Sequence, residues 1–107
     1  MFNKISIIGC GLIGSSILRA IVEKKLASKI SAYDKSSKVI DYLKKNFSIE
    51  VCNNISNAVK DSDLVIIASP LSSYKEILLS IQSNLKKNVI LTGYSNLVVI
   101  TFICSEN

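Results

Sequence analysis

The sequence predicts an α/β fold in which helices cover both faces of a doubly wound parallel sheet of about five strands. Three observations support this prediction. Apolar segments with strand character alternate with segments of helical periodicity from residue 4 to residue 91. One of them, Leu64 to Ala68, is apolar on both faces, as a strand inside a covered parallel sheet must be. A length of 107 residues favours a single domain.

The first half of the chain contains the clearest change of period. Residues 4–8 are expected to form a buried strand, and residues 12–25 a helix whose inward face is Ile13, Ile17, Leu18 and Ile21. A second strand is predicted at 29–33. A helix follows from Ser36 or Ser37 to Lys45, with Val39, Tyr42 and Leu43 facing inward and Asn46 as a left-handed stop.

The second half repeats the alternation. A weak strand at 49–52, a short helical turn at 55–60 and the strand at 64–68 are followed by a strongly amphipathic helix and a fifth strand at 89–91. The apolar positions of that helix are Tyr74, Ile77, Leu78, Ile81 and Leu85.

Composition narrows the functional classes. The net charge of +5 comes largely from lysine pairs at predicted helix ends, where cations favour the helix dipole, so a nucleic-acid partner is not expected. The three cysteines, Cys10, Cys52 and Cys104, form no C-x-x-C pair, and the chain has no histidine, so neither a metal site nor a disulfide framework is expected. With no signal peptide and no membrane span predicted, we expect a cytoplasmic location.

Three glycines follow the first strand and open the first helix. Gly9, Gly11 and Gly14 form G-x-G-x-x-G, a pattern that favours dinucleotide binding in this context. Gly9 permits a tight turn, Gly11 lets a diphosphate approach the backbone, and Gly14 allows close packing of the helix on the strand. The amides of Cys10, Leu12 and Ile13 belong to the same binding loop, and the hydroxyls of Ser15 and Ser16 are expected to add contacts.

An acidic residue ends the second strand, 20 positions after Gly14. We expect Asp34 to accept hydrogen bonds from the adenosine ribose, which favours NAD because a carboxylate repels a 2′-phosphate. NADP stays possible, since Lys35, Ser36 and Lys38 follow directly and offer groups that bind a phosphate. The alternative for Asp34 is a solvated loop acid or a helix cap.

Two further positions complete the predicted cofactor site. Ser69 and Pro70 end the fourth strand and are expected to border the nicotinamide half of the cofactor, because ligands of open α/β sheets lie beyond the carboxyl ends of the strands. An ordinary strand-to-helix turn is the alternative. The side chain of Cys10 is expected to fill space under the glycine turn rather than to act as a reactive thiol.

With these residues, the chain resembles the N-terminal Rossmann domain of the prephenate and arogenate (cyclohexadienyl) dehydrogenases of tyrosine biosynthesis. The resemblance runs over about residues 4–92 and rests on the segments "ISIIGCGLIGSSILRAI", "SAYDKS", "DSDLVIIASPL" and "LKKNVILT". It implies an NAD(P)-dependent oxidative decarboxylation that also needs a histidine and a separate helical domain for substrate and dimer contacts.

The chain departs from that family after Thr92. Gly93 stands where the family has an acid, the lysine that should follow is missing, and the apolar segment "LVVITFIC" at 97–104 has no family counterpart. We therefore expect a cofactor domain at 1–92 and an atypical tail at 93–107 that derives from a truncation or a frameshift. Only five residues separate the tail from the fifth strand, so it can return only as an antiparallel hairpin or lie loosely on the surface.

The predicted function is therefore the cofactor-binding part of such a dehydrogenase, inactive alone and with no catalytic residue of its own. A small-molecule substrate is expected only in a full-length relative, and the sequence leaves the oligomeric state open. Two alternatives remain: a free-standing NAD(H)-sensing module, and a fragment of a β-hydroxyacid-dehydrogenase-type reductase. The Leu12-Ile13 pair favours the prephenate or arogenate dehydrogenase interpretation over the reductase.

Overall fold

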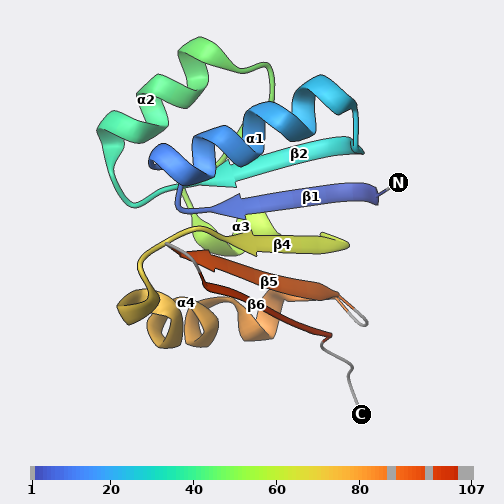
Figure 1. The fold of residues 1–107 in the computed structure, drawn as a ribbon, viewed down its shortest axis with the longest axis vertical. Helices are drawn as coiled ribbons and strands as arrows, with labels where there is room; N and C mark the ends of the chain where they lie inside the picture. Colours follow the sequence, from blue (N-terminus) through green and yellow to red (C-terminus); the bar gives the residue numbers. More distant parts are fainter. Residues whose placement is uncertain (1, 87–88, 96–97, 104–107) are drawn as a thin grey trace.

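In the computed structural model, which describes residues 2–86, 89–95 and 98–103, the strands of the described residues form one sheet in the order β3-β2-β1-β4-β5-β6 (Figure 1). The first five strands pair in parallel and β6 is antiparallel to β5. The strands are β1 (Phe2–Ile8), β2 (Ala27–Tyr33), β3 (Glu50–Val51), β4 (Leu64–Ile67), β5 (Ile90–Ser95) and β6 (Val98–Ile103).

Four α-helices are described along the chain, each following one of the parallel strands. They are α1 (Leu12–Lys24), α2 (Ser37–Asn46), α3 (Ile55–Val59) and α4 (Tyr74–Ile81), with short 3₁₀ turns at Leu71–Ser73 and Gln82–Asn84. Figure 1 shows α1 and α2 beside β1 and β2, and α4 beside β5 and β6. The predicted doubly wound α/β fold is confirmed.

The core consists of two apolar layers, one on each face of the sheet. One layer packs the β1 side chains Ile5 and Ile7 against Leu18 and Ile21 of α1 and Leu43 of α2. The other packs alternate residues of β4 and β5 against α3 and α4, namely Val65, Ile67, Leu91, Ala58, Val59 and Ile81. Burial on both faces explains why the central strands read as continuous apolar runs.

Details of the predicted helices need correction. Asn46 does not act as a left-handed stop, because it lies in the last turn of α2 and Phe47 follows with an extended φ of −136°. Tyr42 is exposed rather than inward, and its hydroxyl lies 3.4 Å from an Arg19 guanidinium nitrogen. The helix predicted to reach Leu85 ends its α-helical part at Ile81 and tightens into the 3₁₀ turn.

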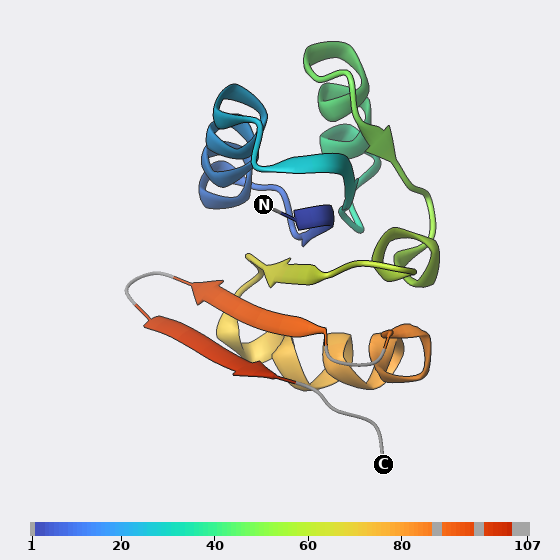
Figure 2. The same ribbon diagram turned by 90° about the vertical axis from the view of Figure 1, so that its right-hand side faces the viewer.

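Of the two arrangements left open for the tail, the structure has the antiparallel hairpin. It pairs Ile90 with Ile103 and Ser95 with Val98, and Figure 2 shows it as the two red strands at the edge of the sheet. Leu97 and Cys104, the ends of the predicted apolar tail, lie outside the described residues, and so does Lys87. The division into residues 1–92 and 93–107 stays a prediction, and β5 runs across that boundary.

At Gly93 in β5, where the resembling family has an acid, the ring of Tyr74 occupies the space that a side chain would need. A Cβ atom there would lie 2.3 Å from Cε2 of Tyr74, the first residue of α4. The Tyr74 hydroxyl donates a hydrogen bond to the carbonyl oxygen of Ile67 at 2.9 Å, which fixes the ring over β5. Burial raises the pKa of Tyr74, so this donor keeps its proton.

None of the helices in the described part of the chain has the length and apolar character that crossing a bilayer requires.

Candidate dinucleotide-binding site

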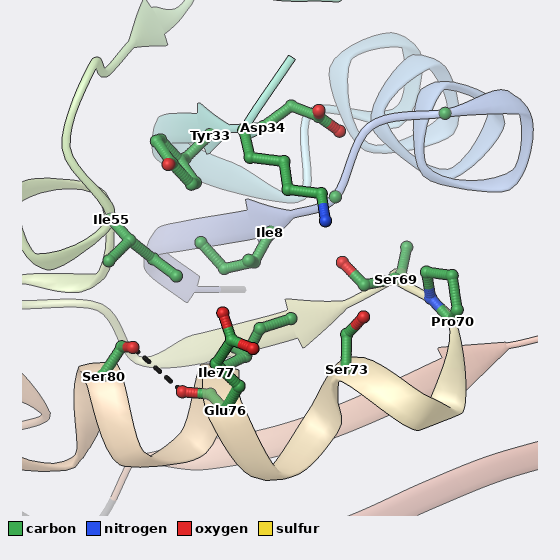
Figure 3. A pocket seen from close by; sticks show the side chains of 14 residues that line it. Ile8, Tyr33, Asp34, Ile55, Ser69, Pro70, Ser73, Glu76, Ile77 and Ser80 are labelled. Atoms are coloured by element: carbon green, nitrogen blue, oxygen red, sulfur yellow. Dashed lines mark hydrogen bonds between the residues drawn. The ribbon is translucent and has the colours of Figure 1, made fainter.

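The candidate site lies where the strand order reverses. β1 and β4 are neighbours in the sheet, while the chain leaves β1 toward β2 on one side and β4 toward β5 on the other. Such a switch point opens a crevice at the carboxyl ends of the strands, where ligands of open α/β sheets bind. A cavity of about 370 Å³ occupies this place (Figure 3), a volume in the usual range for small-molecule sites.

The three glycines differ in what the fold requires of them. Gly9 has a φ of +87°, a left-handed conformation that favours glycine. A Cβ on Gly14 would lie 2.1 Å from the carbonyl oxygen of Gly9, so the close contact of α1 with the turn requires its absence. A Cβ on Gly11 would have no heavy atom within 4 Å, and it would project into open space beside the cavity.

The start of α1 leaves its first amides available. Gly11 is the N-cap and brings no capping side chain, and the first turn holds no acidic residue. Helix-start amides have no partner within the helix and lie at the positive end of its dipole, so they suit an anionic group. The Leu12 side chain is 90% exposed beside them.

The hydroxyls of Ser15 and Ser16 are both bonded to backbone carbonyl oxygens of the same segment. Ser15 donates to the carbonyl oxygen of Cys10 at 2.9 Å, and Ser16 donates to that of Leu12 at 3.0 Å. Both hydroxyl protons are used within the turn and helix in this structure, and a contact of these side chains with phosphate stays a prediction.

Asp34 is joined directly to the glycine loop. Its Oδ2 accepts a hydrogen bond from the amide of Cys10 at 2.8 Å, and its Oδ1 accepts one from the amide of Ser36, also at 2.8 Å. These bonds hold the carboxylate at the cavity wall, where Asp34 and Lys35 both line it. A carboxylate has about four acceptor positions, so two bonds leave capacity for ribose hydroxyls.

The side chain of Cys10 has a structural role. It is 2% exposed, and its Sγ lies 3.9 Å from the carbonyl oxygens of Ile7 and Tyr33. Burial, followed by the nearby Asp34 charge, raises the pKa of the Cys10 thiol to about 12. The thiol is therefore protonated at neutral pH, which fits the space-filling role predicted for it rather than a reactive one.

The structure gathers six of the ten predicted cofactor residues around one cavity: Gly9, Gly11, Asp34, Lys35, Ser69 and Pro70. The other four, Cys10, Leu12, Ile13 and Gly14, do not line it. Cys10 instead holds Asp34 through its amide, and Gly14 shapes the turn. The cofactor contacts themselves stay predictions.

Eight further lining residues were not predicted. They are Ile8, Tyr33, Ile55, Ala68, Ser73, Glu76, Ile77 and Ser80. Part of this set had a pattern in the sequence: Ser73, the N-cap of α4, and positions 76, 77 and 80 within α4 follow one another at helical spacing. That face combines polar residues with Ile77, which sequence analysis placed in the core.

Comparison with known proteins agrees with this geometry. The family described as "NADP oxidoreductase coenzyme F420-dependent" matches residues 4–95. The cyclohexadienyl dehydrogenase of Zymomonas mobilis is 37% identical over 92 residues, which cover 85% of this chain and 31% of that enzyme. The chain spans less than a third of the length of each curated relative it matches.

Solved structures share the fold. Prephenate dehydrogenase from A. aeolicus, in complex with hydroxyphenyl propionate and NAD+, superposes with a TM-score of 0.78 at 21% identity, covering 89% of this chain and 34% of that one. The 3-hydroxyisobutyrate dehydrogenase of Mycobacterium tuberculosis superposes with a TM-score of 0.81 at 15% identity, covering 91% of this chain and 33% of that one. At these identities the likeness concerns the fold alone.

Proposed function

Because the chain belongs to the family of coenzyme F420-dependent NADP oxidoreductases, we propose that it is the dinucleotide-binding part of an NAD(P)-dependent dehydrogenase acting on prephenate or arogenate. The observation that carries the proposal is the bonded pair of Asp34 and the glycine loop at the edge of a cavity of ligand size. The sequence identity to a cyclohexadienyl dehydrogenase supports the substrate class.

The residues of this chain have distinct parts in the proposal. The α1 amides after Gly11 receive the diphosphate, and Asp34 receives the adenosine ribose. Ser69 and Pro70 at the end of β4 border the position of the nicotinamide. The bound cofactor would supply a hydride acceptor for an oxidation in which carbon dioxide leaves the substrate.

The histidine that the resembling family uses for acid–base chemistry on the substrate hydroxyl has no counterpart here. The sequence contains no histidine, and among the residues lining the cavity the ionisable ones are Asp34, Lys35, Glu76 and Tyr33. Two of these, Asp34 and Lys35, have roles at the adenosine end of the proposed site. We therefore propose that this chain binds and orients the cofactor, and that substrate turnover depends on residues outside it.

The test is binding by the purified 107-residue chain. NAD and NADP are titrated separately, and unfolding is followed by heat or urea. Binding at 100 times the dissociation constant is expected to raise the free energy of unfolding by about 2.7 kcal/mol. We expect NAD to bind more tightly than NADP, because Asp34 repels a 2′-phosphate. The proposal would be contradicted if neither NAD nor NADP, at millimolar concentration, changed the free energy of unfolding.

The substrate class needs a separate measurement. Adding prephenate or arogenate to the chain with NAD is expected to produce no NADH. Fusing residues 1–92 to the substrate domain of the Zymomonas mobilis enzyme, in place of its own cofactor domain, is expected to restore NADH production with a cyclohexadienyl substrate. A fusion that folds and binds NAD but produces no NADH would show that this cofactor domain does not fit a cyclohexadienyl substrate domain, and would favour the reductase alternative.

A further inference from the structure

The cavity continues past Asp34, away from the glycine loop. Figure 3 shows Ile55 and Ser80 at the end of the cavity farthest from Ser69 and Pro70. In a dinucleotide the adenine base is attached to the ribose on the side away from the diphosphate. With the diphosphate at the glycine loop and the ribose at Asp34, the base therefore enters this far part, a step that rests on the proposed function.

The far part has the surfaces that a purine ring needs. Its walls include the apolar side chains of Ile8, Ile55 and Ile77 together with the ring of Tyr33. A flat heterocycle gains free energy by leaving water for such surfaces. One carboxylate, that of Glu76 on α4, lies at the rim of this apolar part and points into the cavity (Figure 3).

The local sequence predicts that Glu76 caps the start of α4, and this capping bond is absent from the structure. Ser73 and Glu76 have the S-x-x-E spacing of a capping box, in which the glutamate accepts from the backbone amide of the serine. Here the Ser73 amide donates instead to the carbonyl oxygen of Pro70 at 2.9 Å, and the Ser73 side chain makes no capping bond.

Glu76 is also not engaged in an ion pair within the described residues, where the one salt bridge joins Lys86 and Asp63. The backbone carbonyl of Glu76 accepts a hydrogen bond from the Ser80 hydroxyl at 2.9 Å. This bond lies within α4 and does not involve the carboxylate. A carboxylate that faces the cavity can accept a hydrogen bond from a donor group of the base, whereas the anionic diphosphate offers it no donor.

We propose that the Glu76 carboxylate accepts a hydrogen bond from the 6-amino group of adenine. This bond makes the site selective for adenine over hypoxanthine dinucleotides. An ionised carboxylate only accepts hydrogen bonds, and the 6-amino group donates them. Hypoxanthine carries a carbonyl oxygen at the same position, so a carboxylate placed for the 6-amino group meets an acceptor there and can keep a bond only by moving to the neighbouring ring N1–H. A site built to bond a polar group rejects an analogue that lacks it more strongly than an apolar pocket does.

The experiment compares NAD with nicotinamide hypoxanthine dinucleotide, which differs only at the base, by calorimetric titration of the 107-residue chain. We expect NAD to bind about tenfold more tightly, a modest ratio for a charge-assisted bond because Glu76 is exposed to water. In Glu76→Gln the amide can turn to donate or accept, so the two affinities are expected to agree within about twofold.

A second Glu76 variant and a control variant test whether the selectivity depends on Glu76. Glu76→Ala is expected to lose selectivity as well, while Glu23→Gln, an exposed glutamate of α1 that does not line the cavity, should keep the wild-type ratio. Equal affinities in the wild-type chain, or a ratio that survives both Glu76 variants, would overturn the inference and leave dinucleotide binding standing. Absence of binding by both dinucleotides would instead overturn the proposed function.

Discussion

At the scale of single residues, the glycines of one motif differ in what they permit. The Cβ test separates a position that the fold needs, Gly14, from one that faces open space, Gly11. Substituting the first should damage the fold, and substituting the second should damage only binding. The two effects are usually confounded when a glycine motif is mutated as a unit.

We predict that Gly14→Ala lowers the free energy of unfolding by about 2 to 3 kcal/mol, because its Cβ would overlap the Gly9 carbonyl oxygen and the backbone must move. Gly11→Ala is expected to change stability by less than about 0.5 kcal/mol. It should nevertheless weaken NAD binding by tenfold or more, since a methyl group would displace the diphosphate from the amides, at a loss of about 1.5 to 3 kcal/mol.

Urea unfolding and calorimetric titration of both variants measure these effects. Equal destabilisation by the two substitutions would show that the space beside Gly11 is not free in solution. Unchanged NAD affinity in Gly11→Ala would remove the diphosphate from the start of α1.

Residue roles could be predicted from the sequence where the backbone determines them. Gly9, Gly11, Gly14 and Asp34 follow from a turn, a helix start and a strand end, all of which have sequence patterns. The hydrogen-bond partner of a side chain could not be predicted where two partners lie within its reach. The hydroxyl of Ser15 bonds Cys10 rather than facing outward, and Glu76 leaves its capping position because Pro70 already holds the Ser73 amide.

At the scale of helices and strands, apolar periodicity located every parallel strand, and boundaries were less accurate. β5 extends to Ser95, past its predicted end at residue 91, because pairing with β6 continues the ladder. Its glycine is explained only by Tyr74 from another element. Such contacts between distant segments leave no local pattern in the sequence.

One such contact joins three strands at the end of the sheet opposite the cavity. The Asp63 carboxylate, before β4, accepts from the Asn3 amide at 2.6 Å and from the Lys4 amide at 3.3 Å, and forms an ion pair with Lys86. The Asp63 carbonyl also accepts from the Ile90 amide at 3.0 Å. The Lys86 hydrogen bond, and after it the Asn3 amide, hold the pKa of Asp63 below its usual value of 3.8.

We predict that Asp63→Asn lowers the free energy of unfolding by about 1 kcal/mol at neutral pH, since charge-assisted bonds to backbone amides weaken while the exposed ion pair contributes little. The native pKa is depressed, so the contribution is complete above pH 3.8 and is lost as the pH falls through the native pKa. The stability difference between wild type and variant should therefore shrink in acid.

Urea unfolding at about pH 7 and at about pH 3 tests this. Asp41→Asn, at an exposed position of α2, is the control and is expected to show no such convergence. A difference that stays constant between the two pH values would mean that the Asp63 charge is not what joins the strands.

At the scale of the whole molecule, the site and the unusual end of the chain are separate. Every residue that lines the cavity falls between Ile8 and Ser80, while the hairpin lies at the far edge of the sheet. The two edges also differ: β3 has two residues and includes Glu50, whereas β6 has six residues with no charge and no proline. Long uncharged edges favour pairing with other chains.

We predict that ending the chain after Ser95 leaves the NAD dissociation constant within about twofold of the full value, a difference below about 0.5 kcal/mol, because no lining residue is removed. The same truncation makes β5 the edge strand, and β5 also has six residues with no charge and no proline, so concentration-dependent self-association, which sedimentation velocity measures, is expected to persist. Its free energy of unfolding should fall, because the β5–β6 ladder is lost. An NAD affinity that drops tenfold in a truncated chain that still folds would show that the hairpin supports the crevice through the sheet. Self-association that falls on truncation would show that β6 itself, rather than any uncharged edge strand, forms the contact.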